Sequence, residues 1–314
     1  MSQPDSRLHP QAAALLAEMG SRPGMPTVEM ARAGHELLTA KFTVPGPEMA
    51  RVEDLALGGA GGTPPVAVRH YVPASAPRRA IVYMHGGGWV TGTLDTYDAL
   101  CRELARAADA QVFSVGYRLA PEAPYPAGLD DCETAVAGIL ADAAAFGIDA
   151  DRVVLAGDSA GGHLALGVAR RRQAAGAPPV AGLVLIYPVT DVGHDSASME
   201  AFESGYYLTR DLMLWYWQQF IGEDPRGRGD NPELAPLRAN DLGGLPPSFV
   251  VTAGCDVLRD EGEAMVDRIR EQGGRSELLR VPGMLHGFIR FGGRLDAAGE
   301  AIEAIASRVR AFTG

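Results

Sequence analysis

The sequence has 314 residues, of which 46% are hydrophobic and 21% are charged, proportions typical of a globular protein rather than a disordered one. Its formal net charge of −11 argues against a general nucleic-acid binder, because such a protein needs cations to meet phosphates. Lys41 is the only lysine among 28 basic residues, and no glycine loop precedes it. A P-loop is therefore excluded, and a Schiff-base lysine is not expected.

The cysteines and the start of the chain indicate the compartment. Cys101, Cys132 and Cys255 form no Cys-x-x-Cys pair, so we expect free, mostly buried thiols and neither a disulfide framework nor a zinc site. The first residues lack a basic segment followed by an apolar one, and no apolar run approaches the length of a membrane span. These features predict a cytoplasmic protein without a membrane span.

The first part of the chain predicts helices and then two strands. Residues 1–45 are mostly helical by their apolar spacing of three and four residues. A loop rich in glycine and proline follows at 57–65. Alternating polarity then predicts strands at 66–72 and 79–85, and the short gap between them favours an antiparallel hairpin or edge pair.

The rest of the chain alternates nearly apolar strands with helical patterns, which predicts an α/β fold with a parallel sheet covered on both faces. The expected strands are 111–117, 152–157, 181–188, 247–254 and 276–281. The expected helices are 95–108, 128–146, 160–174, 259–272 and 295–312.

One long interval interrupts this alternation after residue 188. We interpret 189–240 as a cap insertion over the carboxyl edge of the sheet, to which the helices of 1–50 contribute. The core is then 51–188 together with 241–314. The insertion contains Trp215, Tyr216 and Trp217, for which simple helix packing is an equally good interpretation.

The stretch Gly157-Asp158-Ser159-Ala160-Gly161 follows the G-x-S-x-G pattern and lies between a predicted strand and a predicted helix. A corner of this kind suits a phosphate cradle, a serine nucleophile or a simple turn. The missing lysine and the absent G-x-G-x-x-G spacing disfavour the phosphate cradle. Glycines would relieve crowding around Ser159, and the following helix would direct its positive end toward developing charge.

A serine nucleophile needs an oxyanion hole, a base and an acid. Three glycines, Gly86 to Gly88, follow His85 after a strand, so we expect the N–H groups of Gly87, Gly88 and Ala160 to be the oxyanion donors. Beyond residue 163 the only histidines are His194, at the start of the insertion, and His286, in a loop after the last strand.

We therefore predict His286 as the base. Among the acids after the strand 247–254, Asp256 comes first and is the predicted partner of this histidine. Asp260 and Glu261 fall in a first helical turn, where acids are favoured for another reason.

Together, "HGGG", "YRLAPEAPYPAGLDD", "GDSAGG", "DVLRDE" and "LHGF" resemble the hormone-sensitive-lipase-like esterases, also called bacterial family IV carboxylesterases, on the GDSAG branch. The resemblance covers about residues 66 to 290. It implies an α/β-hydrolase fold with a mostly parallel eight-stranded sheet and a helical cap, and hydrolysis of esters with short to medium acyl chains. It assigns the triad to Ser159, Asp256 and His286. The usual proline after the aspartate is replaced here by Val257.

The resemblance also implies a homodimer paired through the edge of the last strand. In the segment after residue 116, we interpret Tyr117, Arg118 and Glu122 as a scaffold for the oxyanion loop. His85 is expected to orient this loop, and Asp158 to bond loop backbone beside the nucleophile. Candidates for the substrate pocket are Trp89, Tyr187, Tyr206, Leu208, Trp215 and Phe288.

The predicted function is that of a serine carboxylesterase acting on a small-molecule ester through an acyl-enzyme, without a metal or organic cofactor. The same triad would serve for an amide, an acetylated small molecule or a lactone. A non-catalytic small-molecule receptor is a further alternative, because plant gibberellin receptors resemble the family. Those receptors lack the catalytic histidine, whereas this chain has His286 in a fitting motif.

Overall fold

A single sheet organises the residues that the computed structural model describes, which are 7–20, 24–58, 64–193, 195–222 and 224–314. Its eight strands lie in the order β1-β2-β4-β3-β5-β6-β7-β8. Their bounds are Arg51–Leu57 (β1), Val66–Val72 (β2), Ala80–Met84 (β3), Gln111–Gly116 (β4), Val153–Asp158 (β5), Gly182–Ile186 (β6), Ser248–Cys255 (β7) and Ser276–Leu285 (β8).

From β4 to β8 the strands run parallel, whereas β1 and β2 are antiparallel to their neighbours. The central strands β3, β5 and β6 are buried along their whole length, as expected of apolar strands covered on both faces. The predicted α/β class with a mostly parallel eight-stranded sheet is confirmed.

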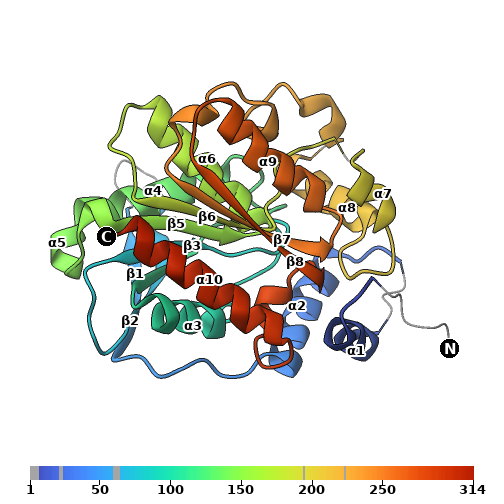
Figure 1. The fold of residues 1–314 in the computed structure, drawn as a ribbon, viewed down its shortest axis with the longest axis horizontal. Helices are drawn as coiled ribbons and strands as arrows, with labels where there is room; N and C mark the ends of the chain where they lie inside the picture. Colours follow the sequence, from blue (N-terminus) through green and yellow to red (C-terminus); the bar gives the residue numbers. More distant parts are fainter. Residues whose placement is uncertain (1–6, 21–23, 59–63, 194, 223) are drawn as a thin grey trace.

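Helices cover both faces of the sheet (Figure 1). In that view α3 and α10 lie below the sheet, and α4, α6 and α9 lie above it. The α-helices are Pro10–Met19 (α1), Val28–Phe42 (α2), Asp98–Ala108 (α3), Ala127–Ala141 (α4), Ala143–Phe146 (α5), Ala160–Ala174 (α6), Ala197–Ala201 (α7), Arg210–Ile221 (α8), Arg259–Glu271 (α9) and Asp296–Phe312 (α10). Short 3-10 helices are Ala150–Arg152 (η2), Pro225–Arg228 (η3), Pro236–Arg238 (η4), Leu242–Gly244 (η5) and Phe288–Phe291 (η6).

The predicted pairing of the strands at 66–72 and 79–85 is wrong. Strand β2 pairs with β1 and β4, and β3 lies on the other side of β4. Helix α3 connects β3 to β4 as a crossover, which places β4 between β3 and β2. Strands β2 and β3 follow one another in the sequence but are not neighbours in the sheet, because β4 lies between them.

Three further elements differ from the prediction. Strand β1 was not predicted, because Arg51, Glu53 and Asp54 give it the composition of an exposed edge. The helix expected at 128–146 is divided into α4 and α5 at Asp142. Strand β8 continues to Leu285, beyond the expected end at 281, and so carries the chain up to His286.

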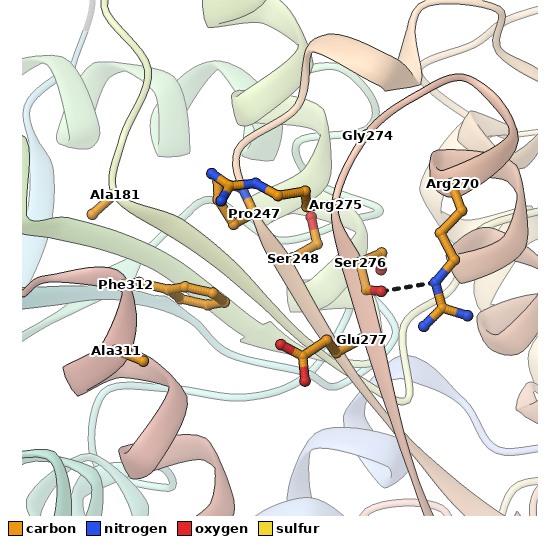
Figure 2. A pocket seen from close by; sticks show the side chains of 10 residues that line it. All are labelled: Ala181, Pro247, Ser248, Arg270, Gly274, Arg275, Ser276, Glu277, Ala311 and Phe312. Atoms are coloured by element: carbon orange, nitrogen blue, oxygen red, sulfur yellow. Dashed lines mark hydrogen bonds between the residues drawn. The ribbon is translucent and has the colours of Figure 1, made fainter.

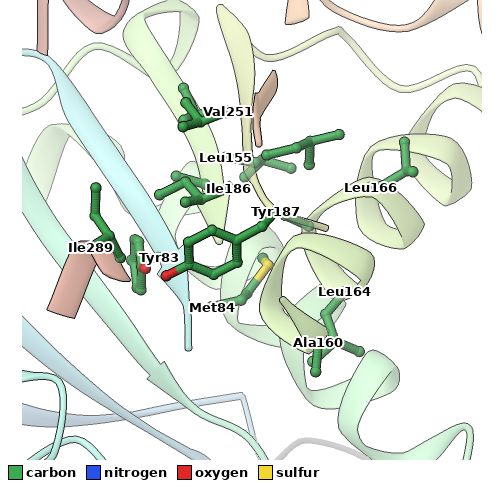
Figure 3. Close-up of a cluster of buried hydrophobic side chains, with 14 of the residues drawn as sticks. Tyr83, Met84, Leu155, Ala160, Leu164, Leu166, Ile186, Tyr187, Val251 and Ile289 are labelled. Carbon is green, nitrogen blue, oxygen red and sulfur yellow. The ribbon is translucent and has the colours of Figure 1, made fainter. Parts of the chain in front are cut away.

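The core beneath the carboxyl edge of the sheet is a dense apolar cluster (Figure 3). Met84 of β3, Leu155 of β5, Ile186 of β6 and Leu164 of α6 belong to this cluster, and all four are fully buried. Such close packing leaves little freedom to the strand ends. The loops that leave these ends therefore start from a rigid base.

The interval between β6 and β7 contains α7, α8, η3, η4 and η5. Helix α8 buries Leu212, Met213, Trp217 and Phe220, so its aromatic residues do contribute to packing. In Figure 1, α7 and α8 lie at the same end of the sheet as α1 and α2. The helices α1, α2, α7 and α8 thus lie over one end of the sheet, where Arg7 Nη1 donates to Ala201 O at 3.3 Å.

Candidate active site

Ser159 lies at the sharp turn between β5 and α6. Its φ of 55° and ψ of −122° are unusual for a residue with a side chain, and such strain is typical of functional turns. The turn is held by hydrogen bonds from Ser159 N to Ile186 O at 2.8 Å and from His163 N to Ser159 O at 3.1 Å. The serine is consequently fixed at the carboxyl edge of the sheet.

The flanking glycines of this turn are required by close backbone approach. A Cβ atom at Gly157 would lie 2.3 Å from the carbonyl oxygen of Gly161. A Cβ atom at Gly161 would lie 1.9 Å from the carbonyl oxygen of Met84, at the end of β3. Both distances are far below van der Waals contact, so the G-x-S-x-G spacing follows from the packing of the turn against β3.

Ser159, His286 and Asp256 form a continuous chain of hydrogen bonds. His286 Nε2 lies 2.9 Å from Ser159 Oγ, and His286 Nδ1 lies 2.7 Å from Asp256 Oδ2. Because a carboxylate accepts the Nδ1 proton, Nε2 is left to accept the serine proton. All three side chains are more than nine-tenths buried.

Neighbouring groups hold the acid and the base in place. Asp256 Oδ1 accepts a hydrogen bond from Leu258 N at 3.0 Å, which fixes the carboxylate at the end of β7. The ring of Tyr187 lies against the imidazole of His286, with the centroids 4.7 Å apart. The base is thus held both by its acid and by ring packing.

The other acids after β7 bind elsewhere. Asp260 accepts from Ser198 N at 2.7 Å and pairs with Arg259. Glu261 accepts from Thr190 N at 2.7 Å, on the segment after β6. Asp256 is therefore the acid that the structure brings to His286, whereas His194 lies outside the described residues.

The glycine loop after β3 borders the same site. Gly87 and Gly88 have φ values of 116° and 61°, and both line the cavity that contains Ser159 and His286. A Cβ atom at Gly88 would lie 2.2 Å from the ring of Tyr216. Ala160, the first residue of α6, presents an N–H group that has no intrahelical acceptor. Gly87 and Gly88 thus border the cavity that contains Ser159, and the N–H group of Ala160 follows this serine directly.

Residues around this loop keep it in shape. Tyr117 donates to His85 O at 2.7 Å, and the two rings stack at 4.3 Å. His85 Nδ1 donates to Gly86 O at 2.8 Å, and burial lowers the pKa of His85 to about 4, so this side chain is neutral at pH 7. The structure thus places Tyr117 and His85 as supports of the loop.

Asp158 joins the nucleophile turn to the glycine loop. Its Oδ1 accepts from Gly86 N and from Tyr83 Oη, both at 2.8 Å, and its Oδ2 accepts from Tyr97 Oη at 3.1 Å. Burial raises the pKa of this carboxyl, whereas its hydrogen-bond donors act in the opposite direction. The residue thus bonds loop backbone, in the way expected from its position.

Arg118 and Glu122 contact helices and do not line the cavity. The Arg118 guanidinium makes several hydrogen bonds to Asp131 of α4, at distances down to 2.7 Å. Glu122 pairs with Arg32 of α2. Both contacts attach the proline-rich segment after β4 to helices, so this segment is scaffold rather than cavity lining.

The cavity at Ser159 has a volume of about 50 Å³. Its lining includes two of the three triad residues, and it consists of His35, Gly87, Gly88, Tyr97, Asp158, Ser159, Tyr207, Leu208, Leu212, Met213, Tyr216, His286, Gly287 and Arg290. Leu208 is the one predicted pocket residue in this set. The α8 residues Leu212, Met213 and Tyr216 were not predicted, although their spacing places them on one helix face.

The structure places three of the other predicted pocket residues, Trp89, Tyr187 and Phe288, behind the lining. Trp89 stacks on Phe220 at 4.4 Å and is 1% exposed. Phe288 is fully buried against Tyr187. Tyr187 itself touches the base rather than the cavity. Large aromatic side chains after strand ends were thus drawn into the core, where their apolar area is better buried.

Tyr206 and Trp215 lie beside the site. Tyr206 packs on Phe202 and lines an adjoining groove of about 1360 Å³ between α1 and the segment 200–212. Trp215 packs on Tyr216 at 5.1 Å, and Tyr216 is the residue that borders the cavity. The groove and the cavity share Tyr207 and Leu212, so they adjoin one another.

A separate hollow of about 580 Å³ lies at the opposite, amino-terminal ends of β6, β7 and β8 (Figure 2). Its lining includes Ser248, Ser276 and Glu277, and Arg270 Nε donates to Ser276 O at 2.9 Å. No histidine lines it. It therefore offers no serine with a neighbouring base, unlike the cavity at Ser159.

The described residues hold no group of three or more His, Cys, Asp or Glu side chains arranged to bind a metal ion. None of their helices is long and apolar enough to cross a membrane. Cys101, Cys132 and Cys255 are buried and form no disulfide, as predicted.

Comparison with known proteins shows the same architecture and chemistry. The sequence profile of the alpha/beta hydrolase fold family matches residues 81–290. The carboxylic ester hydrolase LipN of Mycobacterium tuberculosis is 38% identical over 274 residues, covering 83% of this chain and 72% of LipN. The ethyl acetate hydrolase of Pseudomonas putida is 38% identical over 226 residues, covering 71% of this chain and 70% of that enzyme.

A solved structure is similar over nearly the whole length. The ester-hydrolase EH1AB1 from the metagenome of Lake Arreo matches with a TM-score of 0.89 at 38% identity, covering 97% of this chain and 98% of that chain. The similarity thus includes the strands that carry the site and the segments that lie over it.

Proposed function

As this chain belongs to the α/β-hydrolase family, in its hormone-sensitive-lipase-like branch, we propose that it is a carboxylesterase with Ser159 as nucleophile, His286 as general base and Asp256 as the acid that orients the base. The observation that carries these roles is the buried chain of hydrogen bonds from Ser159 Oγ through His286 to Asp256, at 2.9 and 2.7 Å. The esterases among its relatives support the reaction class.

The geometry supports a two-step mechanism. His286 Nε2 takes the proton of Ser159 as Oγ attacks the ester carbonyl, and Asp256 stabilises the imidazolium. The N–H groups of Gly87, Gly88 and Ala160 hold the oxyanion, and losing one such donor typically costs about 3 kcal/mol of transition-state stabilisation. His286 then protonates the departing alcohol, and water activated by the same imidazole cleaves the acyl-enzyme.

The space around Ser159 supports short to medium acyl groups. The cavity at the nucleophile is small, at about 50 Å³, whereas the adjoining groove of about 1360 Å³ has room for a larger part of a substrate. A relative is described as an ethyl acetate hydrolase, which is an enzyme for a small ester. We therefore propose that small acyl groups are accepted at the serine.

The segments over the sheet edge support a cap. Leu212, Met213 and Tyr216 of α8 line the cavity from 189–240, and His35 of α2 lines it from 1–50. We propose these two segments as the cap and 51–188 with 241–314 as the core.

Strand β8 pairs only with β7 among the described strands, which supports a homodimer through this edge. The buried cysteines, none of which forms a disulfide, support action in the reducing cytoplasm.

The nucleophile is tested with Ser159→Ala, whose kcat/KM for p-nitrophenyl butyrate should fall at least about 10³-fold, because attack by Oγ is lost. Wild type should be labelled covalently by a fluorophosphonate, and the variant should not. Ser276→Ala is the matched control, since Ser276 is buried on β8 in the distant hollow of Figure 2. Wild-type activity in Ser159→Ala would refute the proposal, and so would an unlabelled wild type.

A further inference from the structure

Arg290 is a buried cation in the wall of the catalytic cavity. It lies in η6, four residues after His286, and lines the cavity together with Ser159 and His286. Its side chain is 8% exposed. The proposed hydrolytic mechanism makes no use of this charge, so its presence beside the nucleophile requires a reason of its own.

The contacts of Arg290 leave most of its hydrogen-bonding capacity unused. Nη2 donates to Thr39 Oγ1 at 2.5 Å, and Cζ lies 4.9 Å from the centroid of the Tyr97 ring. Nε is buried without an acceptor among the described residues. A guanidinium has five N–H donors and is always charged in proteins. One hydroxyl and two ring faces, the second that of Phe291 at 5.8 Å from Cζ, therefore satisfy it only in part.

A second arginine shows what this protein does with an equally buried guanidinium. Arg170 is also 8% exposed, and its Nη2 donates to both carboxylate oxygens of Asp241 at 2.9 and 3.1 Å. No carboxylate of the described residues lies within ion-pair distance of Arg290. Burying a charge without such a partner is costly.

Asp158 is the carboxylate whose charge acts on Arg290. Its oxygens already accept hydrogen bonds from Tyr83, Gly86 and Tyr97. It therefore compensates part of the charge from a distance but provides no direct acceptor. A purely structural role, in which Arg290 connects η6 to α2, would explain its hydrogen bond to Thr39. A neutral side chain could make the same hydrogen bond without the cost of burying a cation.

We propose that Arg290 binds a carboxylate group of the substrate, so that the preferred substrates are esters that carry a free carboxylate besides the ester bond. This inference rests on the esterase function proposed above. A carboxylate matches the fork of a guanidinium in two parallel hydrogen bonds. This carboxylate of the substrate takes no part in making or breaking bonds and leaves unchanged with its half of the substrate. The steps at Ser159 and His286 are therefore the same as for an uncharged ester.

Such a site has a specific value in this chain. The net charge of −11 disfavours the approach of anions to the protein as a whole. Inside the cavity the low dielectric strengthens the attraction between one guanidinium and one carboxylate. Arg290 would thus select anionic esters by a local contact rather than by the field of the surface.

Two matched pairs of substrates test the proposal. Ethyl hydrogen succinate and ethyl succinamate differ by carboxylate against carboxamide on the acyl half, and acetoxyacetate and acetoxyacetamide differ in the same way on the alcohol half. Wild type should show a kcat/KM ratio of carboxylate to carboxamide of at least about ten for one pair, as expected for a charge-assisted hydrogen bond. The pair that responds shows which half of the substrate faces Arg290.

Three variants connect the preference to this residue. In Arg290→Gln the ratio should fall to about one, and in Arg290→Lys it should be intermediate, because an ammonium keeps the charge but lacks the fork. The matched control is Arg294→Gln. Arg294 is 37% exposed and pairs with Glu18 on α1, so its variant should keep the wild-type ratio.

Three results would overturn the proposal. The first is a wild-type ratio near one in both pairs while the carboxamide esters are hydrolysed, which would leave the esterase function intact. The second is an equal loss on both members of a pair in Arg290→Gln, which would indicate a positioning role. The third is no hydrolysis of any of the four esters by a wild type that cleaves p-nitrophenyl butyrate, which would leave the esterase function intact; only if p-nitrophenyl butyrate is also left uncleaved does the esterase function fail as well. If Arg290→Gln fails to fold by circular dichroism, the wild-type ratio and Arg290→Lys decide.

Discussion

At the residue scale, the nucleophile turn shows how little freedom the site allows. Ser159 itself has a positive φ, and the two glycines beside it approach backbone atoms so closely that a methyl group would collide. The carbonyl oxygen of Met84, which limits Gly161, belongs to the residue before His85 and the glycine loop. One contact therefore couples the nucleophile turn to the proposed oxyanion donors.

This coupling predicts the effect of Gly161→Ala. Because the new Cβ atom would lie 1.9 Å from Met84 O, β3 and α6 must separate, and the free energy of unfolding should fall by about 3 kcal/mol or more. Activity on p-nitrophenyl butyrate should fall with it, since the glycine loop starts from the displaced strand end. Urea unfolding and initial rates measure the two effects.

Gly299→Ala is the control for this change. Gly299 lies inside α10, and no atom would come within 4 Å of its Cβ. Alanine is a better helix former than glycine, so the free energy of unfolding of this variant should rise by about 0.5–1 kcal/mol and its activity should be unchanged. A Gly161→Ala variant that is as stable and active as Gly299→Ala would contradict the coupling.

At the scale of elements, the segment after β6 is attached to α9 by a buried acid. Glu261 Oε1 accepts from Thr190 N at 2.7 Å and from Asp191 N at 3.2 Å, and Thr190 Oγ1 donates to Glu261 O at 3.0 Å. Asp256 lies five residues before Glu261, at the end of β7. The acid thus anchors the start of the insertion next to the catalytic carboxylate.

Glu261 also makes the stability depend on pH. Burial raises its pKa from 4.5 to about 8 in the folded protein, so the native state holds the proton more tightly than the unfolded chain. Unfolding then releases a proton between these values, and stability falls as the pH rises from about 4.5 to about 8. Glu261→Gln removes the titration but keeps an acceptor oxygen.

Relative to wild type, Glu261→Gln should therefore gain stability with rising pH, by up to about 5 kcal/mol between pH 4.5 and pH 8. Urea unfolding at pH 5 and pH 8.5 measures the difference. Glu271→Gln, at an exposed acid of the same helix, controls for the loss of a negative charge from α9. A stability difference between Glu261→Gln and wild type that is the same at both pH values would count against this explanation.

At the scale of the whole molecule, the amino-terminal helices are joined to the core near the active site. Arg32 of α2 donates from Nε to Val90 O at 3.0 Å and from Nη2 to Ala120 O at 3.2 Å, and it pairs with Glu122. Val90 follows the glycine loop, and Ala120 belongs to the proline-rich scaffold. A single side chain therefore connects α2 to both segments.

The two kinds of contact made by Arg32 predict different costs. Arg32→Ala leaves two part-buried carbonyl groups without this donor, so stability should fall by about 1–3 kcal/mol. Glu122→Gln should cost less than about 1 kcal/mol, because this carboxylate is 63% exposed and solvent screens the pair. Thermal unfolding of both variants gives the comparison, and equal losses would show that the ion pair, rather than the backbone contacts, attaches α2.

The sequence by itself determined the fold class and the three residues that meet in the site. Ser159, Asp256 and His286 each follow a strand in a local pattern, and parallel strands bring their carboxyl ends to one edge of a sheet, so local patterns were enough to bring these residues together. The glycine pattern around Ser159 was likewise readable, because its cause is a collision within a few residues and one neighbouring strand end.

Only the tertiary structure decided the strand neighbours of β2, the existence of the charged edge strand β1 and the lining of the cavity. Strand order depends on crossovers between distant segments, which no local pattern records. Trp89 and Phe288 were drawn into the core, whereas Tyr216 and Arg290 border the cavity. Packing among segments far apart in the chain decides which side chains face the cavity. The triad could therefore be predicted from the sequence, whereas the residues that line the cavity could not.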